Sequence, residues 1–256
     1  MGSAILQGML ASGKWGSADV EALVATESSA VSLREKYGIT VHTSLPSQPG
    51  AYDIVVLAVK PGLIKSVLQP WHGKFGERLL ISVATGVTIE GLQVTLGDPK
   101  AAVIRAMPNT PAQIGRGITV RAAAPGIDPT RLAAADAILE ACGTVLPLEE
   151  SLIDAATAIS GSGPAYFFLV IEALADAGVR LGLPTAVALQ LATETAAGSA
   201  ELLIQSGEHP AILRSKVTSP GGTTIAAIHA LESHGLRAAF FEAAAAAARR
   251  AAELRS

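Results

Sequence analysis

Short apolar runs alternate with apolar stripes at helical spacing from the start of the chain to about residue 148. The clearest run, residues 53–59, is continuously apolar after its first residue, which is typical of a parallel strand buried on both faces. Lys60-Pro61-Gly62 ends this run, and a helical stripe follows. The further predicted strands are 20–25, 39–42, 79–83, 102–106, 118–121 and 144–148, and the predicted helices are 1–12, 29–37, 63–68, 88–96 and 129–142.

This alternation predicts an α/β domain with a parallel or mostly parallel sheet and helices on both of its faces. In such folds, ligands bind beyond the carboxyl ends of the strands. The breaks that follow the predicted strands are therefore the places where chemistry is expected. They are residues 26–29, 60–62, 85–86 and 107–111.

The pattern changes near residue 150, and only helical stripes follow. Alanine is frequent in this part, and we expect its closely packing helices to share their core with a second subunit. The predicted domains are residues 1–149 and residues 150–256. The predicted helices of the second domain are 151–158, 164–181, 184–206, 209–217, 223–234 and 236–254.

Residues 219–224, Ser-Pro-Gly-Gly-Thr-Thr, form a polar turn that leads into one of these helices. The proline fixes one backbone angle, and the two glycines permit a sharp turn or the close approach of a ligand. The two threonines place hydroxyl groups where the backbone N–H groups of a helix are still unpaired. Such a turn is suited to a carboxylate or a phosphate, and an ordinary capped helix start is the alternative.

The composition narrows the function. The chain has 256 residues, half of them apolar, and a net charge of −3 without a basic block, so no nucleic-acid partner is expected. The single cysteine, Cys142, excludes an internal disulfide and lies in an apolar pattern typical of a small buried side chain. No run approaches the length of a membrane span, and no signal-peptide pattern opens the chain. We therefore expect a cytoplasmic protein without a membrane partner.

Other candidate sites are weaker. Glu172 and Asp176 share a helix face and could hold Mg²⁺, although a salt-bridged polar face is the more common role of such a pair. The five histidines have no spacing typical of metal ligands. Ser162 lies in Gly-Ser-Gly, but a nucleophile elbow needs a preceding strand, and the residues before it are predicted to be helical.

Six motifs occur in order along the chain. Together they resemble the pyrroline-5-carboxylate reductases, and the resemblance runs from Met1 to about Leu254. The motifs are Leu57-Ala-Val-Lys-Pro61, Ser82-Val-Ala-Thr-Gly86 with Val87-Thr-Ile89, Arg105-Ala-Met-Pro-Asn-Thr-Pro111, Ser160-Gly-Ser-Gly-Pro-Ala-Tyr166, Glu172-Ala-Leu-Ala-Asp-Ala-Gly178 and Ser219-Pro-Gly-Gly-Thr-Thr224.

The resemblance implies a Rossmann-type domain followed by an all-α dimerisation domain. It implies hydride transfer from NAD(P)H to the C=N carbon of 1-pyrroline-5-carboxylate, which gives L-proline in the last step of proline biosynthesis. A homodimer, or a larger assembly built on dimers, is implied as well. The protein must then hold the C=N carbon against the nicotinamide and make it electron-poor.

The resemblance also carries over to single residues. Thr85 matches a residue near the nicotinamide, and Asn109 lies in the loop beside it. Thr224 matches the threonine whose hydroxyl approaches the ring nitrogen of the substrate. The residues that match the cofactor-contacting run are Ala58, Val59, Lys60 and Pro61, and those that match the substrate turn are Ser219, Gly221, Gly222, Thr223 and Thr224.

The N-terminus departs from the family pattern. The family begins with a strand and a G-x-G-x-M-G turn, of which Met1 and Gly2 match the last two residues. The first strand and most of the glycine-rich turn are absent from the printed sequence. We expect a start site placed too late or an incomplete N-terminus, since a chain lacking both parts should bind the cofactor poorly.

The cofactor preference depends on the residues after the second predicted strand. Glu27 could accept a hydrogen bond from a 2′-hydroxyl and favour NADH, whereas Ser28 and Ser29 could bind the 2′-phosphate of NADPH. Arg34 lies further along the same helix. The two serines and the family resemblance favour NADPH, with NADH as an alternative.

Three other functions remain open. A ketol-acid reductoisomerase has the same plan but needs metal carboxylates. A hydroxyacid dehydrogenase needs an acid–base lysine or histidine, and Lys216 is the one lysine of the helical part. The third alternative is an N-terminally incomplete, cofactor-free dimeric remnant, which would fail to bind NAD(P)H.

Overall fold

The computed structural model describes residues 1–46 and 52–254. The chain divides into two compact units, one made of Met1–Gly161 with Ala247–Ser256 and the other of Ser162–Ala246. Residues 150–161 pack with the first unit because Ile153, only 1% exposed, lies in its core. The predicted domain boundary between residues 149 and 150 stays a prediction.

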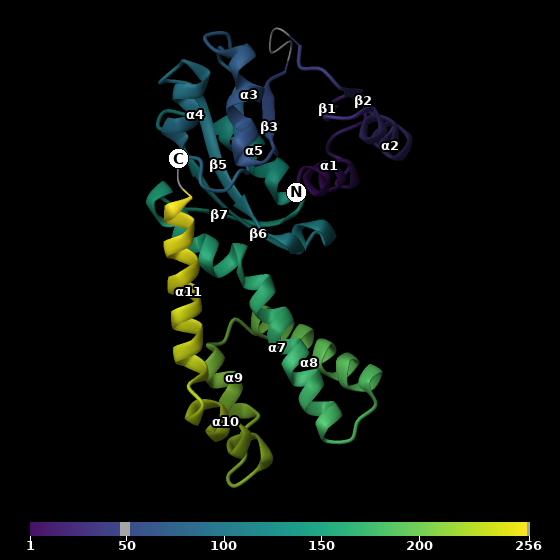
Figure 1. Cartoon of the computed structure of the whole chain (residues 1–256), viewed down its shortest axis with the longest axis vertical. Helices are drawn as coiled ribbons and strands as arrows, with labels where there is room; N and C mark the ends of the chain where they lie inside the picture. Colours follow the sequence, from purple (N-terminus) through teal and green to yellow (C-terminus); the bar gives the residue numbers. More distant parts are fainter. Residues whose placement is uncertain (47–51, 255–256) are drawn as a thin grey trace. The chain divides into compact units, whose positions relative to one another are not determined.

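A five-stranded sheet with the order β3-β4-β5-β6-β7 forms the centre of the first unit (Figure 1). Neighbouring strands are parallel except for β5 and β6, which are antiparallel. The mostly parallel sheet predicted from the sequence is therefore confirmed. The strands are β3 (Ile54–Leu57), β4 (Leu79–Ser82), β5 (Ala102–Pro108), β6 (Gly117–Ala123) and β7 (Gly143–Pro147).

Helices cover both faces of this sheet because side chains alternate along each strand. Leu79 and Ile81 of β4 pack with α1 and α5 on one face. Leu80 packs with α3 and α4 on the other. All three leucine and isoleucine side chains are fully buried. The four helices are α1 (Gly2–Ala11), α3 (Ile64–Leu68), α4 (Ile89–Leu96) and α5 (Pro129–Glu140).

A second, two-stranded sheet pairs β1 (Glu21–Leu23) with β2 (Thr40–His42) in parallel, and α2 (Glu27–Tyr37) connects them. In the described residues, β3 pairs only with β4, so it forms an edge of the main sheet. Its residues Ile54, Val55 and Val56 are half-buried. Ile54 and Val56 pack against the core on one face of the sheet, and Val55 and Leu57 pack against the core on the other. The predicted packing on both faces is therefore confirmed, but burial is incomplete because this edge lacks a second neighbouring strand among the described residues.

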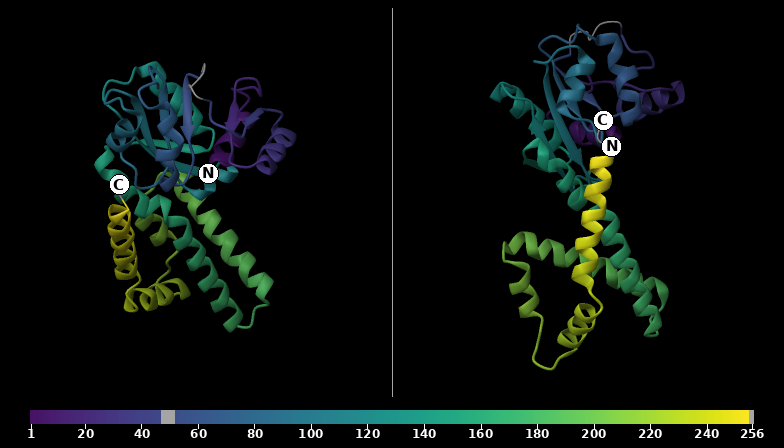
Figure 2. Two further views of the ribbon diagram at one scale, coloured as in Figure 1. Left: turned by 45° about the horizontal axis from the view of Figure 1, so that its top comes forward. Right: turned by 60° about the vertical axis from the view of Figure 1, so that its left-hand side comes forward.

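The second unit is helical. Its first two helices, α7 (Gly163–Arg180) and α8 (Thr185–Ser206), lie side by side (Figure 2). They are followed by α9 (Pro210–Lys216), α10 (Thr223–Ser233) and α11 (Leu236–Glu253), and α11 belongs to the first unit from Ala247 onwards. Many large apolar side chains of this unit are exposed, including Phe167 at 66% and Phe168 at 65%. The unit thus leaves apolar helix faces without a cover in one chain.

One helical run contradicts the expectation that no segment approaches the length of a membrane span. Glu150–Arg180 is long and apolar enough to cross a membrane by length and composition, with a mean hydropathy of 1.4 in its most apolar window. The sequence pattern did not predict this helix as a possible membrane span, because small and hydroxyl-bearing residues interrupt its apolar residues. One such helix is weak evidence for a membrane, since a helix that packs in a protein core passes the same test.

The predicted helix 151–158 has a less regular form. It consists of a 3₁₀ turn (Glu150–Leu152), the short helix α6 (Ile153–Ala156) and a π turn, Thr157–Gly161. The Thr157 hydroxyl donates to the carbonyl oxygen of Ile153 at 2.7 Å. Single π turns of this kind often mark functional positions.

Candidate active site

The loops after β3, β4 and β5 lie at one edge of the sheet because the three strands are parallel neighbours. Leu57, Ser82 and Arg105 stand side by side in the strand register. The predicted cofactor residues 58–61 directly follow the first of these strands. Thr85 follows the second, and its hydroxyl donates to the sulfur of Met107, 3.8 Å away.

Asn109 follows the third strand and is only 9% exposed. Its side-chain oxygen accepts a hydrogen bond from the Ile118 backbone N–H at 2.9 Å. This oxygen therefore fastens the loop after β5 to β6. Asn109 thus has a clear role in holding the loop, and a direct contact with the cofactor stays a prediction.

The start of α1 lies against the loop after β3. A methyl group at Gly2 would come within 3.0 Å of the Ala58 side chain, so the two backbones approach closely. Met1 is the N-cap residue of α1 and provides no side-chain hydrogen bond to the helix. Among the predicted cofactor residues, Met1, Gly2 and Ala58 are therefore brought together beside an open helix start, which suits a phosphate group.

A cavity of about 430 Å³ lies between the starts of α1 and α2, near the end of β1. Three of its four hydroxyl groups belong to α2, which Thr26 caps by accepting from the Ser29 N–H at 3.3 Å. The cavity is polar and sits where the second strand of such a fold ends, so it fits the 2′-phosphate end of NADPH. Its lining residues are Ser3, Val24, Ser28, Ser29, Ser32 and Leu33.

Glu27, the residue that could favour NADH, forms an ion pair with Arg34. An Arg34 guanidinium nitrogen lies 2.6 Å from its carboxylate, and a second one donates to the Val41 carbonyl oxygen at 2.6 Å. Both charged side chains are largely exposed, so the pair adds little stability. The pair nevertheless places a positive charge next to the carboxylate that would otherwise repel a phosphate.

The glycine-rich turn of the second unit has an open helix start. Gly221 has a φ angle of +66°, which only glycine adopts without strain. A methyl group at Gly222 would overlap with the Ser219 hydroxyl oxygen. Gly222 is the N-cap residue of α10, and in the described part of the chain this helix start has no side-chain cap hydrogen bond. The turn therefore leaves the first N–H groups of an 11-residue helix available to an anion.

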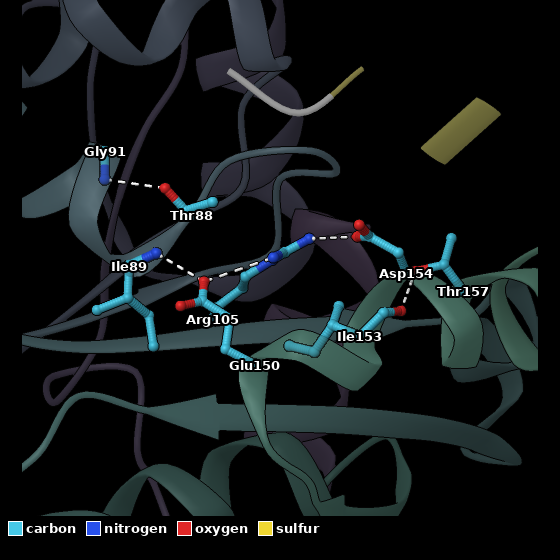
Figure 3. Close-up of polar contacts among 8 residues, drawn as sticks. All are labelled: Thr88, Ile89, Gly91, Arg105, Glu150, Ile153, Asp154 and Thr157. Atoms are coloured by element: carbon cyan, nitrogen blue, oxygen red, sulfur yellow. Dashed lines mark hydrogen bonds and ion pairs between the residues drawn. The ribbon is translucent and has the colours of Figure 1, made fainter. Parts of the chain in front are cut away.

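An ionic cluster in the first unit was not assigned from the sequence. The Arg105 side chain is 4% exposed and lies 3.4 Å from a Glu150 oxygen and 3.0 Å from an Asp154 oxygen (Figure 3). The one available signal was a charged residue inside an apolar strand. Such a residue, when buried, requires partners of opposite charge.

The weaker candidates gain no support as sites. Glu172 and Asp176 are exposed, and no group of three metal-ligating side chains occurs in residues 1–46 and 52–254. Lys216, the lysine required by the hydroxyacid dehydrogenase alternative, is held by Glu208 at 2.6 Å. Cys142 is buried, and burial raises the pKa of its thiol, which confirms the predicted small buried side chain.

Comparisons with known proteins agree with this arrangement. Residues 150–254 match the family model described as pyrroline-5-carboxylate reductase dimerisation. Residues 1–86 match the model described as NADP oxidoreductase, coenzyme F420-dependent. The two models thus match the first 86 residues of the predicted Rossmann-type part and nearly all of the predicted helical part.

Curated relatives and solved structures carry the same family name. A pyrroline-5-carboxylate reductase of Synechocystis is 47% identical over 87% of this chain and 82% of its own length, and one of Arabidopsis thaliana is 38% identical over 99% and 92%. A reductase structure from Coxiella burnetii has a TM-score of 0.92 at 36% identity, covering 100% of this chain and 95% of that one. One from Plasmodium falciparum with NADP bound has a TM-score of 0.86 at 29% identity, with the same coverage. The chain therefore belongs to the pyrroline-5-carboxylate reductase family.

Proposed function

We propose that the turn Ser219–Thr224 holds the carboxylate of 1-pyrroline-5-carboxylate while the first unit holds NADPH. The observation that carries this proposal is the open start of α10, where glycine replaces a capping side chain. An anion at this position would accept hydrogen bonds from the backbone N–H groups and interact favourably with the helix dipole. The amino-acid carboxylate of the substrate is such an anion.

NADPH, when bound, supplies the hydride that reduces the C=N bond. The residues of the chain then have two tasks, which are to hold the substrate ring in place and to make its C=N carbon electron-poor. Thr224 stands in the first turn of α10, among the N–H groups proposed to bind the carboxylate. In this proposal its hydroxyl donates to the ring nitrogen. Thr85 and Asn109, at the sheet edge, position the reacting end of the cofactor.

The decisive experiment is an assay with the native protein, purified from the cells that produce it. We expect it to consume NADPH when 1-pyrroline-5-carboxylate is supplied and to form an equal amount of L-proline. The proposal would be refuted if NADPH were consumed without proline being formed. It would also be refuted if no proline formed with either NADPH or NADH. NADPH fluorescence titration separates a failure to bind the cofactor from a failure of the chemistry.

The hydroxyl-lined cavity predicts a preference for NADPH. Changing Ser28 to alanine should raise the KM for NADPH about tenfold, because one hydrogen bond to a charged phosphate contributes about 1.5–3 kcal/mol. The KM for NADH should stay unchanged, since NADH has no 2′-phosphate. Ser66→Ala is the control, because the Ser66 hydroxyl donates to the Leu63 carbonyl oxygen away from the cavity. Equal changes for both cofactors would contradict the assignment.

The matched dimerisation model supports a homo-oligomer, and we propose a homodimer built on the exposed apolar faces of the second unit. Changing Phe168 to aspartate should give a monomer in sedimentation velocity, since a buried charge without a partner is strongly unfavourable at an interface. Val94→Asp is the control, because Val94 is similarly exposed, at 70%, but lies on α4 of the first unit. If Phe168→Asp sediments like the unchanged chain, α7 lies outside the interface.

A cytoplasmic location, without nucleic-acid or membrane partners, stays a prediction from the sequence. The function proposed above requires only the small substrate, the cofactor and a second copy of the chain.

A further inference from the structure

Arg105 joins two carboxylates that come from a different part of the chain. One guanidinium nitrogen lies 3.4 Å from Glu150 Oε1, and the other donates to Asp154 Oδ1 at 3.0 Å (Figure 3). Arg105 is 3% exposed and Asp154 is 7% exposed. A charge buried to this extent is stable only with partners in good geometry, so the three groups must act as one unit.

The cluster reaches the loop that follows β4. Glu150 Oε1 also accepts a hydrogen bond from the backbone N–H of Ile89, the first residue of α4, at 2.8 Å. Thr88 caps the same helix by accepting from the Gly91 N–H at 3.0 Å. Since Thr85 precedes Ile89 by four residues, the Glu150 carboxylate fixes one end of the Thr85 loop.

The cluster also stands next to the loop that follows β5. Arg105 precedes Asn109 by four residues on the same strand and its continuation. Met107, between them, accepts the hydrogen bond of the Thr85 hydroxyl. A methyl group at Gly161, in the π turn that follows Asp154, would come within 2.9 Å of the end of Met107. The segment 150–161 therefore supports both loops from one side.

We propose that Arg105 is a positioning residue that holds Thr85 and Asn109 in register through Glu150 and Asp154. The inference rests on the proposed function, in which these two loops place the reacting end of the cofactor. Arginine is required because its planar fork offers separate nitrogens to the two carboxylates, whereas lysine presents one compact charge. Without the fork, one carboxylate moves and carries its loop with it.

The first test uses Arg105→Lys and Glu150→Gln in the full-length chain. Glutamine keeps an oxygen for the Ile89 N–H but removes the charge that faces Arg105. We expect kcat to fall about ten- to a hundredfold in Arg105→Lys, and less in Glu150→Gln, because a small misplacement of reacting groups has a large effect on rate. The KM for NADPH should change less than twofold, since the phosphates bind elsewhere. With NADPH deuterated at the nicotinamide C4, the isotope effect on kcat should increase as hydride transfer becomes rate-limiting.

Arg121→Lys is the matched control. Arg121 lies on the neighbouring strand β6 and makes a two-fold contact with Asp136, with both distances 2.7 Å, but reaches neither loop. Its replacement should lower the melting temperature without changing kcat or the isotope effect. If Arg105→Lys behaves in the same way as Arg121→Lys, Arg105 has only a structural role and the inference is overturned.

A second readout does not depend on activity. Hydrogen exchange of the free protein should become faster in residues 83–91 and 107–114 of Arg105→Lys, and stay unchanged in β7. Unchanged exchange in both loops overturns the inference. If the unchanged chain forms no proline, the proposed function fails instead, and the exchange measurement still decides whether Arg105 holds the loops.

Discussion

Replacing Thr224 with alanine is expected to lower kcat by about a hundredfold or more, while the dimer stays folded. A side chain that donates to the reacting nitrogen contributes about 10²–10⁴ to the rate. Thr224 is well suited to this role because it stands in the first turn of α10, whose start carries no side-chain cap. The turn Ser219–Thr224 is closed by a backbone hydrogen bond from the Gly222 N–H to the Ser219 carbonyl oxygen, which does not involve the Thr224 hydroxyl. The measurement is kcat with saturating 1-pyrroline-5-carboxylate and NADPH, beside the circular dichroism spectrum.

Two further variants make this result specific. Thr224→Ser retains the hydroxyl and should recover most of the activity. Thr223→Ala removes the neighbouring hydroxyl and should mainly raise the KM for the substrate. If Thr224→Ala turns over at the normal rate, or if Thr223→Ala has the larger effect on kcat, Thr224 does not act on the ring nitrogen.

Replacing Gly143 with alanine is expected to have the largest effect on stability. Gly143 opens β7 with a φ angle of +135°, and an added methyl group would overlap with the carbonyl oxygen of Gly117 on β6. Neither backbone can move without breaking the pairing of the two strands. Strain and overlap together should lower the free energy of unfolding by on the order of 4 kcal/mol. Urea unfolding followed by circular dichroism measures this change.

Gly126 provides the matched control. Its φ angle is +81°, but nothing lies within 4 Å of an added methyl group. Gly126→Ala should therefore lower the free energy of unfolding by only about 1–2 kcal/mol, the effect of the backbone angle alone. Similar losses in both variants would show that the close approach of Gly143 to Gly117 is unimportant.

The elements of the fold were predictable because each rests on a local pattern. The apolar runs at 79–83 and 102–106 correspond to β4 and β5, and the glycine of the turn at 221 takes the left-handed conformation that the turn required. The environment of β3 was not predictable in the same way. Its exposure depends on which strands lie beside it, and pairing partners are far apart in the sequence.

The candidate site also has parts that the sequence predicts and parts that it does not. The loops after the strands could be found, because carboxyl ends of parallel strands meet at one edge. The role of Arg105 could not, since its partners Glu150 and Asp154 are 45 and 49 residues away. The sequence also left open whether the start of α10 is capped. The structure answers this, because the N-cap residue is Gly222 and the described residues provide no side-chain cap hydrogen bond there.

The uncapped start of α10 sets a limit on how stable this protein can become. A side chain that capped the helix would stabilise it by about 1 kcal/mol. However, it would accept hydrogen bonds from the same N–H groups that are proposed to bind the substrate carboxylate. Stability and substrate affinity thus compete for one set of donors, and selection for a more heat-resistant enzyme would have to act elsewhere in the chain.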